Sequence, residues 1–99
     1  MTLRVVFRKK ALADLRETAA WYDSKRRGLG ERFILAVIRA IDLSVETPIR
    51  RAPVFADVRR IRVPRFPHFI YYFVDSSNFV VLAVFHFRRD PASWSKLKA

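Results

Sequence analysis

The pattern of hydrophobic and polar positions changes from strand-like to helical over the first quarter of the chain. Residues 3–7 (LRVVF) are rich in β-branched side chains, which is typical of a short strand. From Lys9 to Lys25, apolar residues recur every three or four positions, and this spacing predicts an amphipathic helix. Its apolar stripe consists of Leu12, Leu15, Ala19 and Tyr22.

Turn-forming residues separate this helix from a second one. Gly28 is expected to cap the end of the first helix, because glycine readily adopts the left-handed conformation found there. A second apolar stripe predicts a helix from Gly30 to Glu46, and Pro48 ends it because the residue before a proline avoids helical geometry. Two helices joined by such a short turn are expected to pack as an antiparallel hairpin.

The second half of the chain is predicted to be rich in strands. Three runs of β-branched and aromatic residues lie at 58–63, 69–75 and 79–87. The polar segment DSSN at 75–78 predicts a turn, so the last two strands should pair as an antiparallel hairpin. The order is then β-α-α-β-β-β, which favours an α+β fold with the helical hairpin on one face of an antiparallel β-sheet. We expect residues 1–99 to form this single domain.

Both faces of the last two predicted strands are apolar. Tyr71 and Tyr72 alternate with apolar neighbours, and residues 79–87 follow the same pattern. Strands with two apolar faces are covered on both sides, whereas the helical hairpin can cover only one. We therefore expect another polypeptide, or alternatively the C-terminal tail with Trp94 and Leu97, to cover the other face.

Composition and charge narrow the class of protein. The chain has 99 residues, with 20 Lys and Arg against 9 Asp and Glu, and a formal net charge of +11. Such an excess favours anionic partners: nucleic acid, the ribosome or an acidic protein. The longest apolar run is far shorter than the roughly 20 residues that span a bilayer, so we expect a cytoplasmic protein with no membrane partner. Without cysteine and with two histidines, the sequence predicts no disulfide, metal site or cofactor.

Four arginines cluster in and just after the strand predicted at 58–63. Alternation places Arg60 and Arg62 on one face and Arg59 on the other, while Arg65 follows the strand. An array of guanidinium groups can bind phosphates or carboxylates. Alternatively, the arginines only keep an exposed strand soluble and protect a sheet edge. For the cluster as a whole, the surplus of positive charge favours binding.

A second cluster, His86, Arg88 and Arg89, stands at the end of the last predicted strand. Arginine can stabilise a phosphoryl transition state, and histidine transfers protons near neutral pH, so His86 and Arg88 could serve a metal-free ribonuclease. Alternatively, His86 bonds a backbone group, and Asp90 pairs with one of the arginines. The cluster favours an anion-binding corner over a catalytic site.

Four stretches of the sequence resemble the RelE/ParE superfamily of toxins from bacterial type II toxin–antitoxin modules. They are FRKKALADLRETAAWY, GLGERFILAVIRAI, VRRIRVPRFPHFIYYFV and VVLAVFHFRRDPASW, in this order. The resemblance implies the fold described above and a cognate antitoxin that wraps and neutralises the toxin. The motifs are closer to ParE-like members, which are associated with poisoning DNA gyrase, than to RelE-like members, which cut messenger RNA in the ribosomal A site.

Two positions depart from the RelE-like pattern. RelE-like nucleases commonly have an arginine where this chain has Phe69 and a tyrosine where it has Trp94, although Arg88 matches a family arginine. The resemblance therefore implies a toxin that inhibits gyrase by binding rather than by enzymatic chemistry. The alternatives are a ribosome-dependent mRNA endonuclease with His86 and Arg88 as its catalytic pair, and a nucleic-acid-binding module without toxicity.

Two surfaces are predicted on this basis, one for the target and one for an acidic antitoxin. The target-binding residues are Arg59, Arg60, Arg62, Arg65, Arg88, Arg89 and Trp94. The antitoxin is expected to cover the open sheet face and part of the helical hairpin. Its predicted contacts are Trp21, Tyr22, Phe33 and Tyr71.

Overall fold

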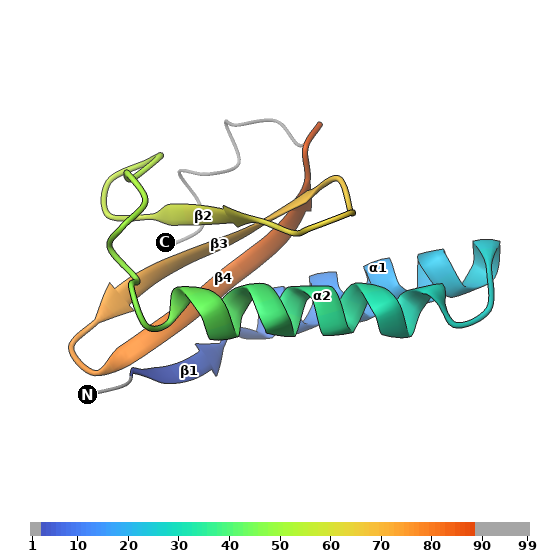
Figure 1. The fold of residues 1–99 in the computed structure, drawn as a ribbon, viewed down its shortest axis with the longest axis horizontal. Helices are drawn as coiled ribbons and strands as arrows, with labels where there is room; N and C mark the ends of the chain where they lie inside the picture. The colour runs from blue at the N-terminus through green and yellow to red at the C-terminus, as the bar shows by residue number, and fades with distance from the viewer. Residues whose placement is uncertain (1–2, 89–99) are drawn as a thin grey trace.

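A computed structural model of the chain describes residues 3–88, which form two helices and four strands (Figure 1). In chain order the elements are β1 (Arg4–Phe7), α1 (Lys9–Lys25), α2 (Leu29–Ser44), β2 (Arg59–Arg62), β3 (His68–Asp75) and β4 (Asn78–His86). This order, with both helices packed against the sheet, confirms the predicted α+β fold class. The tail residues Trp94 and Leu97, predicted as an alternative cover, lie outside the described residues.

The sheet is mixed, with the strand order β1-β4-β3-β2. The pairs β2–β3 and β3–β4 are antiparallel, and Asp75 pairs with Asn78 at the predicted turn. β1 differs from the prediction because it runs parallel to β4, with Phe7 opposite Val81. A parallel pair needs a crossover connection, and the long path through the helical hairpin and the other two strands supplies one.

The main core lies between the helices and one face of the sheet. Side chains from the two helical stripes meet alternate side chains of β3 and β4 there, as amphipathic elements require. Tyr72 and Phe79 stack with ring centroids 4.3 Å apart and 12° between the ring planes. Other buried members of this core are Ala11, Phe33, Val37, Ile70 and Val81.

The opposite sheet face is also buried, contrary to the expectation of an open apolar face. Tyr71, Phe73, Leu82 and Phe85 are each at most 7% exposed. Long cationic side chains lie above aromatic rings of this face, where their apolar stems can cover carbon surface while the charged ends stay near water. The four pairs are Arg8 over Phe73, Lys10 over Phe85, Arg60 over Phe69 and Arg62 over Phe87. This face is therefore covered within the chain.

Gly30 allows the two helices to cross closely. A Cβ atom at this position would overlap the Ala19 carbonyl oxygen and lie 2.8 Å from Asp23 Cγ. The Gly30 amide also donates a hydrogen bond to Asp23 Oδ1 at 2.8 Å, which ties the start of α2 to α1. Gly28, with φ +89°, is the N-cap of α2, whereas α1 ends at its C-cap Arg26. The predicted role of Gly28 at the end of the first helix is therefore wrong, because the turn is so short that this residue directly precedes α2.

The Gly30→Ala substitution should destabilise the fold. Overpacking costs about 1–3 kcal/mol, which outweighs the gain of at most about 1 kcal/mol in helix propensity. Urea unfolding would measure the loss in the free energy of unfolding. Gly28→Asn is the matched control, because no atom lies within 4 Å of a Cβ there and asparagine tolerates positive φ. A Gly30→Ala chain as stable as the wild type would contradict the close crossing.

Candidate functional site

The predicted arginine cluster lies on β2, at one edge of the sheet. Arg60 and Arg62 share the face opposite the helices, with their guanidinium carbons 4.0 and 5.2 Å from the ring centroids of Phe69 and Phe87. Ile61, between them, points to the main core and is 3% exposed. The predicted alternation therefore agrees with the structure for this strand.

Arg59 and Arg65 do not join that pair. Arg59 Nε donates a hydrogen bond to the Arg51 carbonyl oxygen at 2.7 Å, which fixes the loop before β2. Arg65 lies between β2 and β3 with φ 70°, and it lines a groove beside α2. The four arginines therefore divide among three places instead of forming one array.

The adjacent ends of β3 and β4 bring His68 and His86 together. The two residues lie directly opposite in the strand register, and their ring centroids are 5.3 Å apart. Counting back from the turn would place Phe85 opposite His68, but an irregularity between Tyr71 and Tyr72 shifts the register by one residue. Sequence reasoning therefore missed this pair. A cavity of about 310 Å³ beside it is lined by Asp14, Glu17, Thr18, His68, Val84, Phe85, His86 and Arg88.

The two imidazoles of this pair have different environments. His68 is 6% exposed and packs against Tyr22 and Phe33, and its Nδ1 has no hydrogen-bond partner within residues 3–88. Burial, with a smaller effect of His86, lowers the pKa of His68 from 6.5 to about 4, so this imidazole is neutral at pH 7. The exposed His86 accepts a hydrogen bond at Nδ1 from the Arg88 backbone amide at 3.1 Å. His68 is therefore not an imidazolium at neutral pH and cannot act as a general acid there.

Acid should destabilise the protein through His68. Because the folded-state pKa is lowered, the stability contributed by the neutral imidazole is complete above pH 6.5 and is lost as the pH falls towards 4. The full loss amounts to roughly 3 kcal/mol at about 1.4 kcal/mol per pKa unit. Urea unfolding of the wild type and of His68→Phe at pH 7.5 and 4.5 isolates this effect, since other groups titrate in both chains. Equal losses in both chains would contradict a buried neutral His68.

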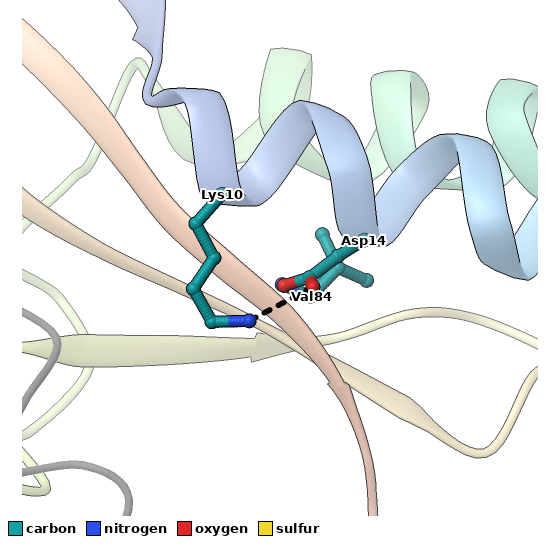
Figure 2. Close-up of polar contacts among 3 residues, drawn as sticks. All are labelled: Lys10, Asp14 and Val84. Atoms are coloured by element: carbon teal, nitrogen blue, oxygen red, sulfur yellow. Dashed lines mark hydrogen bonds and ion pairs between the residues drawn. The ribbon is translucent and has the colours of Figure 1, made fainter.

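Asp14 fixes α1 to the edge of β4 (Figure 2). Its Oδ2 accepts a hydrogen bond from the Val84 backbone amide at 3.0 Å, and its Oδ1 pairs with Lys10 Nζ at 3.0 Å. In the described sheet, β1 pairs with β4 only from Asn78 to Val81, so the Val84 amide lies beyond the end of β1. The carboxylate therefore satisfies an edge amide that would otherwise be open to pairing with another strand.

Asp14 and Lys10 should contribute very differently to stability. Asp14→Ala leaves the Val84 amide without its partner, at a cost of about 1–3 kcal/mol. Lys10→Ala removes a partly exposed ion pair and the contact over the Phe85 ring, each worth about 1 kcal/mol or less, and it leaves the Val84 hydrogen bond in place. Urea unfolding of both variants, with hydrogen exchange at Val84, would measure the difference. Equal small losses and an unchanged exchange rate at Val84 would argue against the bond from helix to strand.

A groove of about 930 Å³ lies between α2 and the segment that joins β2 to β3. Leu35 and Leu43 line it from α2 and are 52% and 74% exposed. Sequence reasoning missed the groove, although two leucines outside the predicted apolar stripe of α2 were a signal. Its aromatic and cationic lining residues are Tyr22, Phe66, Arg32, Arg39 and Arg65.

The predicted antitoxin contacts differ in burial. Tyr22 lines the groove, and the neighbouring Trp21 is 56% exposed. Phe33 is fully buried, with its ring centroid 5.2 Å from that of Phe66, and Tyr71 is only 3% exposed. Phe33 and Tyr71 pack inside the chain and present almost no surface to a partner, so Trp21 and Tyr22 are the predicted contacts that are accessible.

Of the remaining predicted target-binding residues, the structure describes only Arg88. Arg88 lines the cavity beside the histidines, whereas Arg89 and Trp94 lie outside the described residues. Across residues 3–88, no cluster of three metal-ligating side chains is found. Neither described helix has the length and apolar character needed to cross a membrane.

The sequence and the fold of the chain are both similar to those of known proteins. A family model for the ParE toxin of the type II toxin–antitoxin system parDE matches residues 5–91. A solved structure described as a chromosomal ParDE TA system from P. aeruginosa matches with a TM-score of 0.76 and 15% sequence identity, covering 86% of this chain and 96% of that chain. At this identity the structural match shows the fold alone. No curated protein matches the sequence significantly.

Proposed function

Because this chain belongs to the ParE toxin family of type II toxin–antitoxin systems, we propose that it arrests growth in the cytoplasm by binding DNA gyrase. We propose also that an acidic cognate antitoxin neutralises it. The family match over residues 5–91 is the observation that carries this proposal. The formal net charge of +11 supports acidic partners, since complementary charge speeds association and selects partners.

Binding, rather than bond cleavage, is the proposed mode of action. His68 is neutral at pH 7, and Nδ1 of His86 is engaged by the Arg88 backbone amide. The target surface that we propose comprises Arg60, Arg62 and Arg88. The Arg62 guanidinium lies over Phe87, the residue that precedes Arg88 in the chain. Arg89 and Trp94 remain predicted members of the same surface.

For the antitoxin, we propose the groove beside α2 as the binding site. Leu35 and Leu43 offer exposed apolar surface, and Arg32, Arg39 and Arg65 line the same groove. This combination suits an amphipathic helix that has an apolar face and flanking carboxylates. Of the predicted antitoxin contacts, Tyr22 belongs to this proposed site, because it lines the groove.

The Arg60→Ala/Arg62→Ala variant should require at least about tenfold more toxin to inhibit gyrase. Each substitution removes a guanidinium group from the proposed anion-binding surface, and the most important interface arginines each contribute about 2 kcal/mol or more. The measurement is supercoiling by purified gyrase with increasing toxin. Arg16→Ala/Arg50→Ala is the matched control, since it removes the same charge from exposed positions on α1 and in the loop before β2. Urea unfolding checks that both variants are folded.

A parallel assay on a translating ribosome tests the alternative mechanism. Inhibited supercoiling with intact messenger RNA would support the gyrase proposal. Codon-phased cuts in the messenger RNA, with supercoiling unaffected by the toxin, would overturn it in favour of the endonuclease. Equal inhibition by Arg60→Ala/Arg62→Ala and the wild type would show that the target binds a different surface.

A further inference from the structure

The turn of the helical hairpin forms a cationic tip that projects beyond the sheet (Figure 1). We define the hairpin tip as Trp21, Lys25, Arg26 and Arg27. The three cations are consecutive, are exposed, and form no ion pair with any residue of the described range 3–88. The nearby carboxylate of Asp23 is directed to the Gly30 amide within the hairpin. The tip therefore presents three adjacent cations that form no ion pair within the described residues.

Trp21 supplies an apolar anchor among these charges. Its side chain is 56% exposed, and Lys25 Nζ lies 5.2 Å from the centroid of its ring. Trp21 is not one of the described residues that line the groove beside α2, so the proposed antitoxin site does not explain why its side chain is exposed. Tryptophan and arginine, together with tyrosine, are the residue types enriched among those that dominate binding energy.

The hairpin tip is held in one conformation by hydrogen bonds. The Arg26 amide donates to the Tyr22 carbonyl oxygen at 2.9 Å, and the Leu29 amide donates to the Arg26 carbonyl oxygen at 3.0 Å. Ser24 Oγ donates to the Trp21 carbonyl oxygen at 2.6 Å. A preorganised element of this kind loses little conformational entropy when it binds.

The tip lies at the same end of the molecule as the proposed target surface. Tyr22, next to Trp21, contacts Phe66 and His68 with ring centroids 5.1 and 5.9 Å apart. His68 lies opposite His86 at the end of β4, two residues before Arg88. Cationic groups from the hairpin and from the sheet can therefore face one partner from the same end.

We propose that the hairpin tip docks onto an acidic protein surface of the toxin's target, with Trp21 entering an apolar pocket surrounded by carboxylates. This inference rests on the proposed function, because it names a second contact with the same protein target. A protein is favoured over nucleic acid because the Lys25 ammonium already covers one face of the indole. Only the other face is then open for a base to stack on, whereas insertion of the ring edge into a pocket leaves the Lys25 contact intact.

Two tip variants, Trp21→Ala and Lys25→Glu/Arg26→Glu/Arg27→Glu, test this proposal. Each should need at least about tenfold more toxin than the wild type to inhibit gyrase and to arrest growth, because interface anchors of this kind dominate binding. Their affinity for the antitoxin should fall less than their inhibition of gyrase, because the tip lies outside the groove and touches it only where Trp21 packs on Tyr22. Unfolding in urea confirms that the variants are folded.

Matched controls separate the tip from total charge and from the groove. Arg4→Glu/Arg16→Glu/Arg50→Glu makes the same change in net charge at other exposed positions, and it should retain inhibition within about threefold, because only distant charge is altered. Leu43→Glu, a substitution in the groove, should weaken binding of the antitoxin and leave the inhibition of gyrase unchanged.

Four outcomes would overturn the assignment of the tip. They are tip variants that inhibit as well as the wild type, tip variants that lose antitoxin affinity as strongly as target inhibition, a distant control that loses inhibition equally, and DNA affinity that falls in parallel with toxicity. If the wild type arrests growth without affecting gyrase, the gyrase proposal fails, and the growth assay with the same variants still decides the role of the tip. A wild type that does not arrest growth contradicts both proposals.

Discussion

The close approach of α1 and α2 at Gly30 sets the position of the other features. A side chain there would meet the Ala19 carbonyl oxygen, so any other residue would separate the helices. Because they lie close together, their apolar stripes form one surface that covers the sheet, and the ring of Tyr22 reaches Phe33, Phe66 and His68. The same crossing fixes the direction of the turn, which carries the cations of the hairpin tip away from the sheet (Figure 1).

The surplus of positive charge also has a structural use. On the face opposite the helices, four cationic side chains lie over phenylalanine rings at 4.0 to 5.6 Å from the ring centroids. These side chains help to bury an apolar sheet face that no helix covers. Other cations, at the hairpin tip and around the groove beside α2, have no such role in the fold. Arg60 and Arg62, which belong to the proposed target surface, therefore also serve the fold.

Local patterns in the sequence determine much of the fold. The apolar stripes predict the two helices, and the DSSN turn predicts the β3–β4 hairpin. The structure confirms these elements. The parallel direction of β1 could not be predicted, because no local pattern records which strand it joins. His68 and His86 meet through a register irregularity, and the hydrogen bond from the Val84 amide to Asp14 joins residues 70 positions apart. Burial of Phe33 and Tyr71 depends on such distant contacts, so no local pattern shows that these two predicted antitoxin contacts lie inside the chain.

We propose that the chain acts by binding an acidic protein target through its cationic surfaces. The most direct test is equilibrium binding of the full chain to purified gyrase at increasing salt concentration. The account predicts tight binding at low salt that weakens steeply as the ionic strength rises, because exposed charges are screened beyond about 8–10 Å near physiological salt. The absence of binding, or an affinity that does not change with salt, would contradict it.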